Sequence, residues 1–115
     1  MVNGRKARGM KTQALIAEDL KTSGIYPYAT DAGAGRSGAD ILNTPGVSIE
    51  VKARANFDPM ASLRQAKTNT VENEAAIVVC RMNGQGPANI DDWVAFTTWG
   101  QMKEFIEWKR DQALG

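Results

Sequence analysis

The sequence predicts an α/β fold in which a central mixed β-sheet is flanked by helices. Two observations support this prediction. Segments with helical periodicity alternate with strand-length apolar segments, and one of these, Ala75 to Met82, is an almost continuous apolar run. Such a run is typical of a buried central strand. Because 115 residues can bury one core but not two, we expect a single domain over residues 10–115.

The first helix is predicted over Met10 to Thr22, because its apolar residues share one side and Ser23-Gly24 ends the pattern. A short strand is expected over residues 25–30, followed by a glycine-rich segment over residues 31–38. The glycines would let the backbone approach a ligand closely, although they also suit a flexible loop.

Residues 38–54 are predicted to form a β-hairpin, because two apolar alternations flank a turn signal at Asn43-Thr44-Pro45-Gly46. A three-residue loop places Asp40 opposite Glu50. Slipping the pairing by one residue would split these acids, so we prefer the first register. The alternating side chains then form two faces. One face is apolar, with Ile41, Val47, Ile49 and Val51, and the other is polar, with Asp40, Ser48, Glu50 and Lys52.

The second half of the chain predicts a helix, two strands and a final helix. Asp58-Pro59 combines an N-cap residue with proline at the first helical position. Strands are expected over residues 75–82 and 93–96. The last helix is expected after Thr98, which fits a capping box with Gln101 and precedes a stripe of apolar residues. The predicted order is therefore helix, three strands, helix, two strands, helix.

Composition excludes several classes of function. The chain has no histidine, which excludes histidine general bases, HNH-type nucleases and ordinary zinc sites within it. Cys80 is the only cysteine, so no intramolecular disulfide can form. No apolar run is long enough to span a membrane, and the N-terminus lacks a signal-peptide core. We therefore expect a cytoplasmic protein with no membrane partner, in the host cytoplasm if a phage encodes it.

The net charge of +1 is unevenly distributed. Residues 1–67 contain ten Lys/Arg and six Asp/Glu, or +4, whereas residues 68–115 contain four and seven, or −3. The basic half contains the predicted hairpin, as a phosphate-binding face requires, although a solvated surface of mixed charge gives the same count. Residues 1–9 are basic and glycine-flanked, and we expect them to form a flexible arm that contacts nucleic acid; a solvated tail is the alternative.

The polar face of the predicted hairpin favours metal chemistry. Asp40 and Glu50 would lie directly across from each other, and like charges in that position are destabilising unless something intervenes. Mg²⁺ would intervene, because it binds one or two carboxylates and keeps waters and substrate phosphate as further ligands. Lys52 on the same face would hold a water or stabilise charge on a phosphate. The alternative is an ordinary exposed strand face with a weak pair between Glu50 and Lys52.

Asp40, a short hairpin and Glu50-Val51-Lys52 resemble the signature of the PD-(D/E)XK nuclease superfamily, with Ala39 where the family name has proline. The glycine-rich segment and the acidic first helix resemble the archaeal and phage Holliday junction resolvases of that superfamily. The resemblance covers the order of elements over about residues 10–82. It implies a restriction-endonuclease-like core and a metal-dependent endonuclease that uses Mg²⁺, with Mn²⁺ as a substitute and no organic cofactor.

The resemblance also implies roles for individual residues. Asp40, Glu50 and the backbone carbonyl of Val51 would bind the metal, and Lys52 would assist the attacking water. In these resolvases an acidic residue of the first helix reaches the metal, directly or through water, and Glu18 is the matching candidate.

Two alternatives to this assignment of the first helix remain open. Asp19 competes with Glu18 for the role. Glu18 would otherwise be a boundary residue paired with Lys11 or Lys21.

We expect branched DNA as the substrate, because a chain of this length has little room for a separate sequence-reading domain. A glutamine after the Glu-X-Lys strand recurs in several such nucleases, which adds Gln65, although a surface amide is the alternative. The expected DNA contacts are basic or polar side chains: Arg5, Lys6, Arg8, Lys11, Arg36, Ser37, Arg54, Arg64, Gln65 and Lys67.

A four-way junction needs two symmetric cuts, so we expect a homodimer. Trp108, which points away from the apolar stripe of its helix, and Met60 are candidates for the dimer contact. Two other functions remain open: a flap, nick or restriction-type nuclease, and a noncatalytic nucleic-acid-binding module of the same fold.

Overall fold

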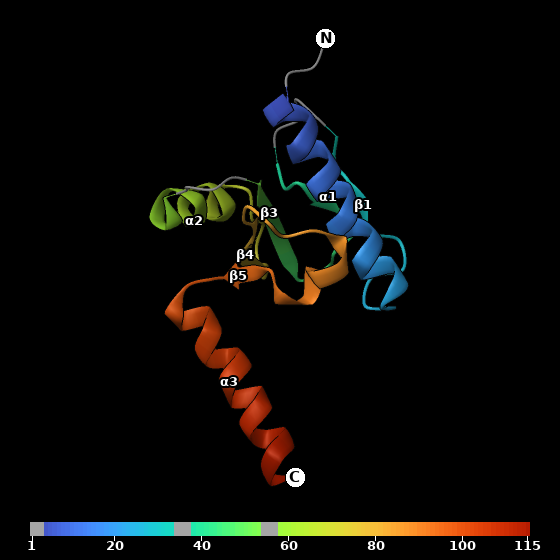
Figure 1. Cartoon of the computed structure of the whole chain (residues 1–115). Coiled ribbons are helices and arrows are strands. Elements are labelled where there is room, and N and C mark those ends of the chain that lie inside the picture. Colours follow the sequence, from blue (N-terminus) through green and yellow to red (C-terminus); the bar gives the residue numbers. More distant parts are fainter. Residues whose placement is uncertain (1–3, 34–37, 54–57) are drawn as a thin grey trace.

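Helices flank a three-stranded mixed sheet and a separate antiparallel strand pair (Figure 1). The computed structural model describes residues 4–33, 38–53 and 58–115, with side chains from residue 9 onward. The predicted order of helices and strands is confirmed, with a short 3-10 helix added before the last strand. The elements are α1 Gly4–Thr22, β1 Thr30–Asp31, β2 Ile41–Leu42, β3 Val47–Ala53, α2 Pro59–Thr68, β4 Ala75–Arg81, η1 Pro87–Asp92, β5 Val94–Phe96 and α3 Trp99–Leu114.

The larger sheet has the order β3-β4-β5. β3 and β4 are parallel, with Cα partners running from Val47↔Ala75 to Ala53↔Arg81, whereas β4 and β5 are antiparallel. Parallel neighbours need a crossover connection, and α2 supplies it. Asp58 caps α2, because its carboxylate accepts hydrogen bonds from the Met60 and Ala61 N–H groups at 3.0 and 3.2 Å.

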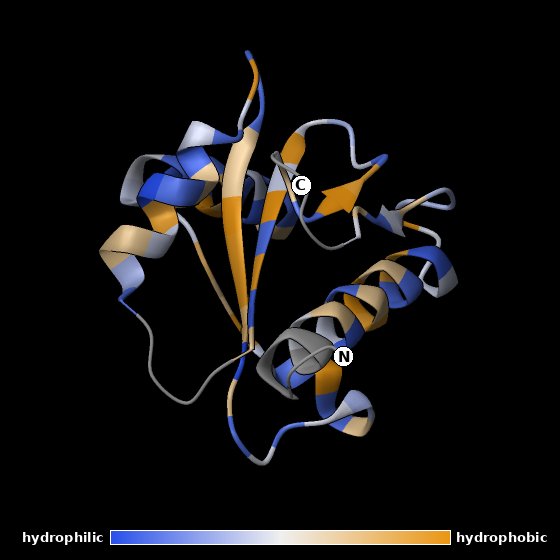
Figure 2. Ribbon diagram, turned by 90° about the horizontal axis from the view of Figure 1, so that it is seen from above, coloured by the Kyte–Doolittle hydropathy of each residue, from blue (hydrophilic) through white to orange (hydrophobic). Residues whose placement is uncertain are grey.

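α1 and α2 lie on opposite sides of this sheet (Figure 2). Ile49 and Val51 point towards α1 and form the main core with Ile16 and Ala17. Ser48, Glu50 and Lys52, which alternate with these residues along β3, point towards α2 and are covered by it. The predicted apolar and polar faces of this strand are therefore both confirmed. A second cluster, Ala66, Ala76 and Val78, lies between α2 and β4.

The predicted hairpin between the strands at 39–42 and 47–51 is wrong. β2 pairs with β1, as Thr30↔Leu42 and Asp31↔Ile41, and β3 pairs with β4 instead. The turn between β2 and β3 is closed: the Val47 N–H donates to the Thr44 carbonyl at 3.1 Å, and the Thr44 hydroxyl donates to the Val47 carbonyl at 3.0 Å. β2 and β3 remain neighbours beyond it, because Ile41 and Ile49 share one core cluster and the Asp40 N–H donates to the Ile49 carbonyl at 3.0 Å, but they form no ladder.

Two boundaries also differ from those predicted. α1 begins at Gly4 and not at Met10, so residues 4–9 of the expected arm continue the helix. The strand expected over residues 25–30 is reduced to β1, because turns fill most of this segment: the Ala29 N–H donates to the Tyr26 carbonyl at 3.1 Å. In the described parts of the chain, no helix is long and apolar enough to cross a bilayer.

Candidate active site

Glu50 and Lys52 lie next to each other on the face of β3 that α2 covers. The Lys52 Nζ is 3.3 Å from the Glu50 Oε1, and the two side chains are only 13% and 4% exposed, respectively. Period-two alternation places them on one face, and the crossover helix buries them. The alternative of an ordinary exposed surface pair is therefore wrong.

α2 holds both members of this pair. The Lys52 ammonium donates to the Gln65 Oε1 at 2.9 Å, and the side-chain amide of Asn69 hydrogen-bonds the Glu50 carboxylate. Residues four apart on a helix are about 6 Å apart along its axis, and residues two apart on a strand are about 6.6 Å apart. α2 runs antiparallel to β3, so Gln65 lies beside Lys52, and Asn69, four residues later, lies beside Glu50, two residues earlier. The nearly equal spacings let both contacts form at once. Sequence reasoning had not identified Asn69, since this match is a tertiary contact.

Asp40 reaches the same site from the segment before β2. Its Oδ2 accepts a hydrogen bond from the Val51 N–H at 2.7 Å, and its own N–H is bound to the Ile49 carbonyl. Asp40 therefore fills a position along β3 that a neighbouring strand would otherwise occupy. Asp40 and Glu50 are close together, as predicted, although the hairpin does not form. Asp40 makes both contacts with β3 itself, one through its carboxylate and one through its backbone N–H.

The ionised forms of the two carboxylates are destabilised in this site. Burial raises the pKa of Asp40, and the Val51 N–H and the Lys52 charge only partly offset this. Burial also raises the pKa of Glu50, the Asp40 charge raises it further, and Lys52 and Asn69 oppose the shift. One lysine thus balances a buried acid, Glu50, and a partly buried acid, Asp40. A second positive charge would stabilise both carboxylates in their ionised form.

These donors fit a cation that needs few protein ligands. Mg²⁺ binds one or two carboxylates and retains several waters, so Asp40, Glu50 and the Val51 carbonyl form a suitable donor set. Among the described residues, no group of three or more His, Cys, Asp or Glu side chains is placed to hold a metal.

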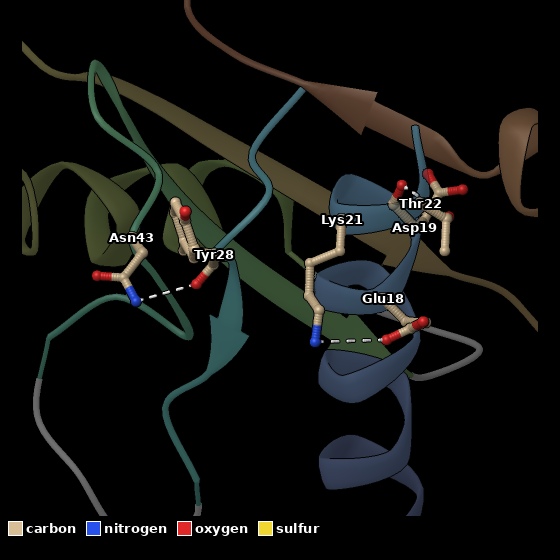
Figure 3. Close-up of polar contacts among 6 residues, drawn as sticks. All are labelled: Glu18, Asp19, Lys21, Thr22, Tyr28 and Asn43. Atoms are coloured by element: carbon tan, nitrogen blue, oxygen red, sulfur yellow. Dashed lines mark hydrogen bonds and ion pairs between the residues drawn. The ribbon is translucent and has the colours of Figure 1, made fainter. Parts of the chain in front are cut away.

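Glu18 is not brought to this site. Its side chain is 64% exposed and forms an ion pair with Lys21 at 3.7 Å (Figure 3). The physical reason is the helical phase: Glu18 lies two residues after buried Ile16, or roughly 200° around the helix axis. The surface-pair alternative for Glu18 is thus the arrangement observed, with Lys21 as the partner.

Gln13 occupies the inner side of α1 that had been expected for Glu18. Its Oε1 is buried and has no hydrogen-bond partner within the described part of the chain. The neighbouring Thr12 is fully buried and accepts a hydrogen bond from Arg81 at 3.4 Å, which places this turn of α1 near the carboxyl ends of β3 and β4. A buried oxygen without a partner is costly and needs an explanation. One signal in the sequence could have identified Gln13. It lies three residues before Ile16 and four before Ala17, and this spacing places it on the same side of the helix.

The remaining predicted contacts divide into two groups. Lys11, Arg64, Gln65 and Lys67 are exposed, and the last three lie on α2, the helix that covers Glu50 and Lys52. Three predicted contacts, Arg36, Ser37 and Arg54, lie outside the described residues. Three more, Arg5, Lys6 and Arg8, lie in α1 but outside the described side chains.

Comparison with known proteins adds no assignment. A scan against protein-family models, a search of curated proteins and a search of solved structures each found no match to this chain.

Proposed function

We propose that this chain is a Mg²⁺-dependent endonuclease that hydrolyses phosphodiester bonds in branched DNA, similar to the Holliday junction resolvases of the PD-(D/E)XK superfamily. Its mixed sheet and flanking helices would then be a restriction-endonuclease-like core. One observation carries the proposal: Asp40, Glu50 and Lys52 meet in one partly buried site although they come from segments that do not form a hairpin.

The chain's own residues have distinct roles in this reaction. When bound, Mg²⁺ would act as a Lewis acid and lower the pKa of a coordinated water. Asp40 and Glu50 would hold the cation, and α2 would keep Glu50 in place through Asn69. Lys52, held between Glu50 and Gln65, would donate a hydrogen bond to the attacking water or to the phosphate oxygen on which charge develops.

Exposed basic residues support a nucleic acid as the substrate. Arg64 and Lys67 lie on α2, the helix that covers Glu50 and Lys52, and both side chains are exposed; Lys11 on α1, on the other side of the sheet, is also exposed. The choice of branched DNA rests on the resemblance of Asp40 and Glu50-Val51-Lys52, together with the glycine-rich segment, to junction resolvases.

The proposal is tested by incubating the protein with four-way junction, flap, nicked and linear duplex DNA, each with Mg²⁺ or with EDTA. We expect cleavage of the junction with Mg²⁺, none with EDTA, and a loss of at least 100-fold in Asp40→Asn and in Glu50→Gln. Glu18→Gln is the matched control, because it also removes a carboxylate, but one that is exposed and paired with Lys21.

Other outcomes would select a different function. Equal cleavage of flap, nicked and junction DNA would favour a general structure-specific nuclease. Tight junction binding without cleavage under Mg²⁺ or Mn²⁺ would overturn the proposal and favour the noncatalytic binding module. Full activity in Asp40→Asn would show that the site has been assigned wrongly.

A further inference from the structure

α3 extends away from the rest of the molecule (Figure 1). None of its residues is buried, so most of its surface is open to solvent. The start of the helix is fixed, because the Thr97 hydroxyl donates to the Ala76 carbonyl at 2.6 Å. The Thr98 hydroxyl then caps the first turn by accepting from the Gln101 N–H at 3.2 Å. α3 is therefore a projecting element that is anchored to the sheet at one end.

The charged side chains of α3 are divided between two sides of the helix. Successive residues are about 100° apart around a helix axis, so the three acids lie within an arc of about 60°: Glu104, Glu107 and Asp111. All three basic side chains lie in the other half of the helix: Lys103, Lys109 and Arg110. The helix has no net charge, yet one half is acidic and the other is basic.

Large apolar side chains share the basic half of α3. Trp99 and Ile106 lie between its basic residues, Phe105 lies beside Lys109, and all three apolar side chains are exposed. Trp108 borders this half and contacts Phe105, with ring centroids 6.1 Å apart, and the Lys109 Nζ is 5.8 Å from the centre of the Trp108 ring. Exposed aromatic residues on one element indicate an interaction surface, whereas single ones are ordinary.

The surface is defined by six residues, which we call the basic–aromatic face: Trp99, Lys103, Phe105, Ile106, Trp108 and Lys109. Arg110 lies in the same half, but Asp111 matches its charge at a distance of 2.9 Å.

We propose that the basic–aromatic face of α3 binds an unpaired strand of DNA, as a site separate from the candidate active site. Aromatic side chains stack with bases that a duplex would hide, and cations beside them contact the phosphates. Phe105 and Trp108 would stack with bases, and Lys103 and Lys109 would contact phosphates. The 16 residues of α3 span about 24 Å, which matches roughly seven nucleotides at about 3.4 Å each.

The charge pattern favours nucleic acid over a membrane or a protein. A helix that lies on a membrane surface has basic residues on its polar side, opposite the apolar side, whereas the polar side of α3 is acidic. The centre of a protein–protein interface is depleted of lysine, whereas Lys103 and Lys109 lie among the aromatic residues. A polyanion is attracted to the basic half and repelled by the acidic half, so the two halves would orient α3 on a DNA strand.

α3 also begins near the candidate active site. Ala76, which accepts the hydrogen bond from Thr97, is the β4 partner of Ser48, and Ser48 is two residues before Glu50 on β3. A strand bound along α3 would therefore lead from the tip of the helix to the sheet that carries the site. This arrangement suits a branched DNA in which an unpaired arm adjoins a duplex. The choice of DNA over RNA rests on the proposed function.

Binding of a labelled oligothymidine of about 15 nucleotides, measured by fluorescence anisotropy in EDTA, tests the inference without any cleavage. We expect Phe105→Ala and Trp108→Ala each to weaken binding by at least about 5-fold, because each removes a ring on which a base stacks. An abasic oligonucleotide of the same length keeps the phosphates and lacks the bases. It should bind the wild type more weakly than oligothymidine does, and the two aromatic variants should not weaken it further.

Charge variants separate stacking from phosphate contact. Lys109→Gln should weaken the binding of both oligonucleotides and reduce the salt dependence of log K by about 0.7, as expected for one lost phosphate contact with a single strand. Glu107→Gln is the matched control, because it removes one charge from the acidic side of the same helix, and we expect no loss of affinity. A loss in Glu107→Gln equal to that in Lys109→Gln would contradict the inference, because binding would then not depend on the basic–aromatic face.

The outcomes distinguish this inference from the proposed function. An oligothymidine affinity that is unchanged in both aromatic variants would overturn the inference, even if the protein cleaves junctions with Mg²⁺. A wild-type dissociation constant above ~100 μM would also overturn it, because that is the weak end of nonspecific electrostatic binding. Weaker binding in both variants would support the inference even if the protein cleaves no DNA, in which case only the proposed nuclease activity fails.

Two further measurements identify the other possible partners. If phosphatidylserine vesicles bind the wild type but neither aromatic variant, while oligothymidine affinity is unchanged, the partner is a membrane surface and the inference is wrong. If light scattering shows a fall in mass in these variants, with the same unchanged affinity, the face is a protein contact and the inference is equally wrong.

Discussion

Replacing Lys52 with methionine tests the charge balance at the centre of the site. The Lys52 Nζ lies 3.3 Å from a Glu50 carboxylate that is 4% exposed. Methionine has a similar length but no charge, so it leaves Glu50 buried beside Asp40 with no cation near either acid. Removing one partner of a buried ion pair typically costs about 3–5 kcal/mol. Because Asn69 still hydrogen-bonds Glu50, we expect the lower end, about 3 kcal/mol.

The measurement is urea unfolding at pH 7.5 in EDTA, followed by circular dichroism. Thermal unfolding in the same buffer gives a second readout, in which a loss of about 3 kcal/mol should lower the melting temperature by roughly 10 °C or more in a domain of this size. Lys21→Met is the matched control, because it removes a lysine from the exposed pair with Glu18, and we expect a change within about 1 kcal/mol. Adding Glu50→Gln to Lys52→Met should recover most of the loss. Equal stability changes in Lys52→Met and Lys21→Met would refute the reasoning.

Three further predictions concern the same site. Asn69→Leu should weaken Mg²⁺ binding about 10-fold by calorimetry, because Glu50 loses the amide that orients it; an unchanged affinity would mean that Asn69 only ends α2. Gln13→Leu should raise the free energy of unfolding in EDTA by about 1 kcal/mol, because it removes a buried oxygen that has no partner, and a destabilised variant would contradict this. The folded-state pKa values of Asp40 and Glu50 are raised above 3.8 and 4.5, so the folded state binds more protons, and metal-free stability should fall as pH rises through these folded values. Asp40→Asn should flatten this fall in urea unfolding measured from pH 4.5 to 8, and a stability that increases over this range would reverse the sign of the argument.

The local features of the site could be predicted from the sequence. Glu50 and Lys52 are two residues apart in an alternating strand, so their common face follows from the period of a β-strand alone. The Asp58 cap of α2 is equally local. Strand pairing was not predictable in the same way: each residue of β3 pairs with a residue 28 positions further along the chain, from Val47↔Ala75 to Ala53↔Arg81, and no local pattern specifies such a distant partner.

The helical phase of α1 explains the error over Glu18. Glu18 was placed at the edge of the apolar stripe because Ile16, Ala17 and Leu20 were taken to define it. The buried side also includes the polar residues Thr12 and Gln13, whose burial depends on Arg81 and on the ends of the strands. Only the packed structure determines which polar residue of an amphipathic helix faces inward.

The Val51 N–H donates a hydrogen bond to the Asp40 carboxylate, so the properties of this backbone amide depend on the state of the candidate site. Most amide protons in a sheet report on a neighbouring strand, but this one reports on an acidic side chain that is a candidate metal ligand. Its NMR chemical shift and its rate of exchange with deuterium should therefore respond to anything that polarises or moves Asp40. This single backbone amide therefore offers a spectroscopic probe of a candidate metal ligand.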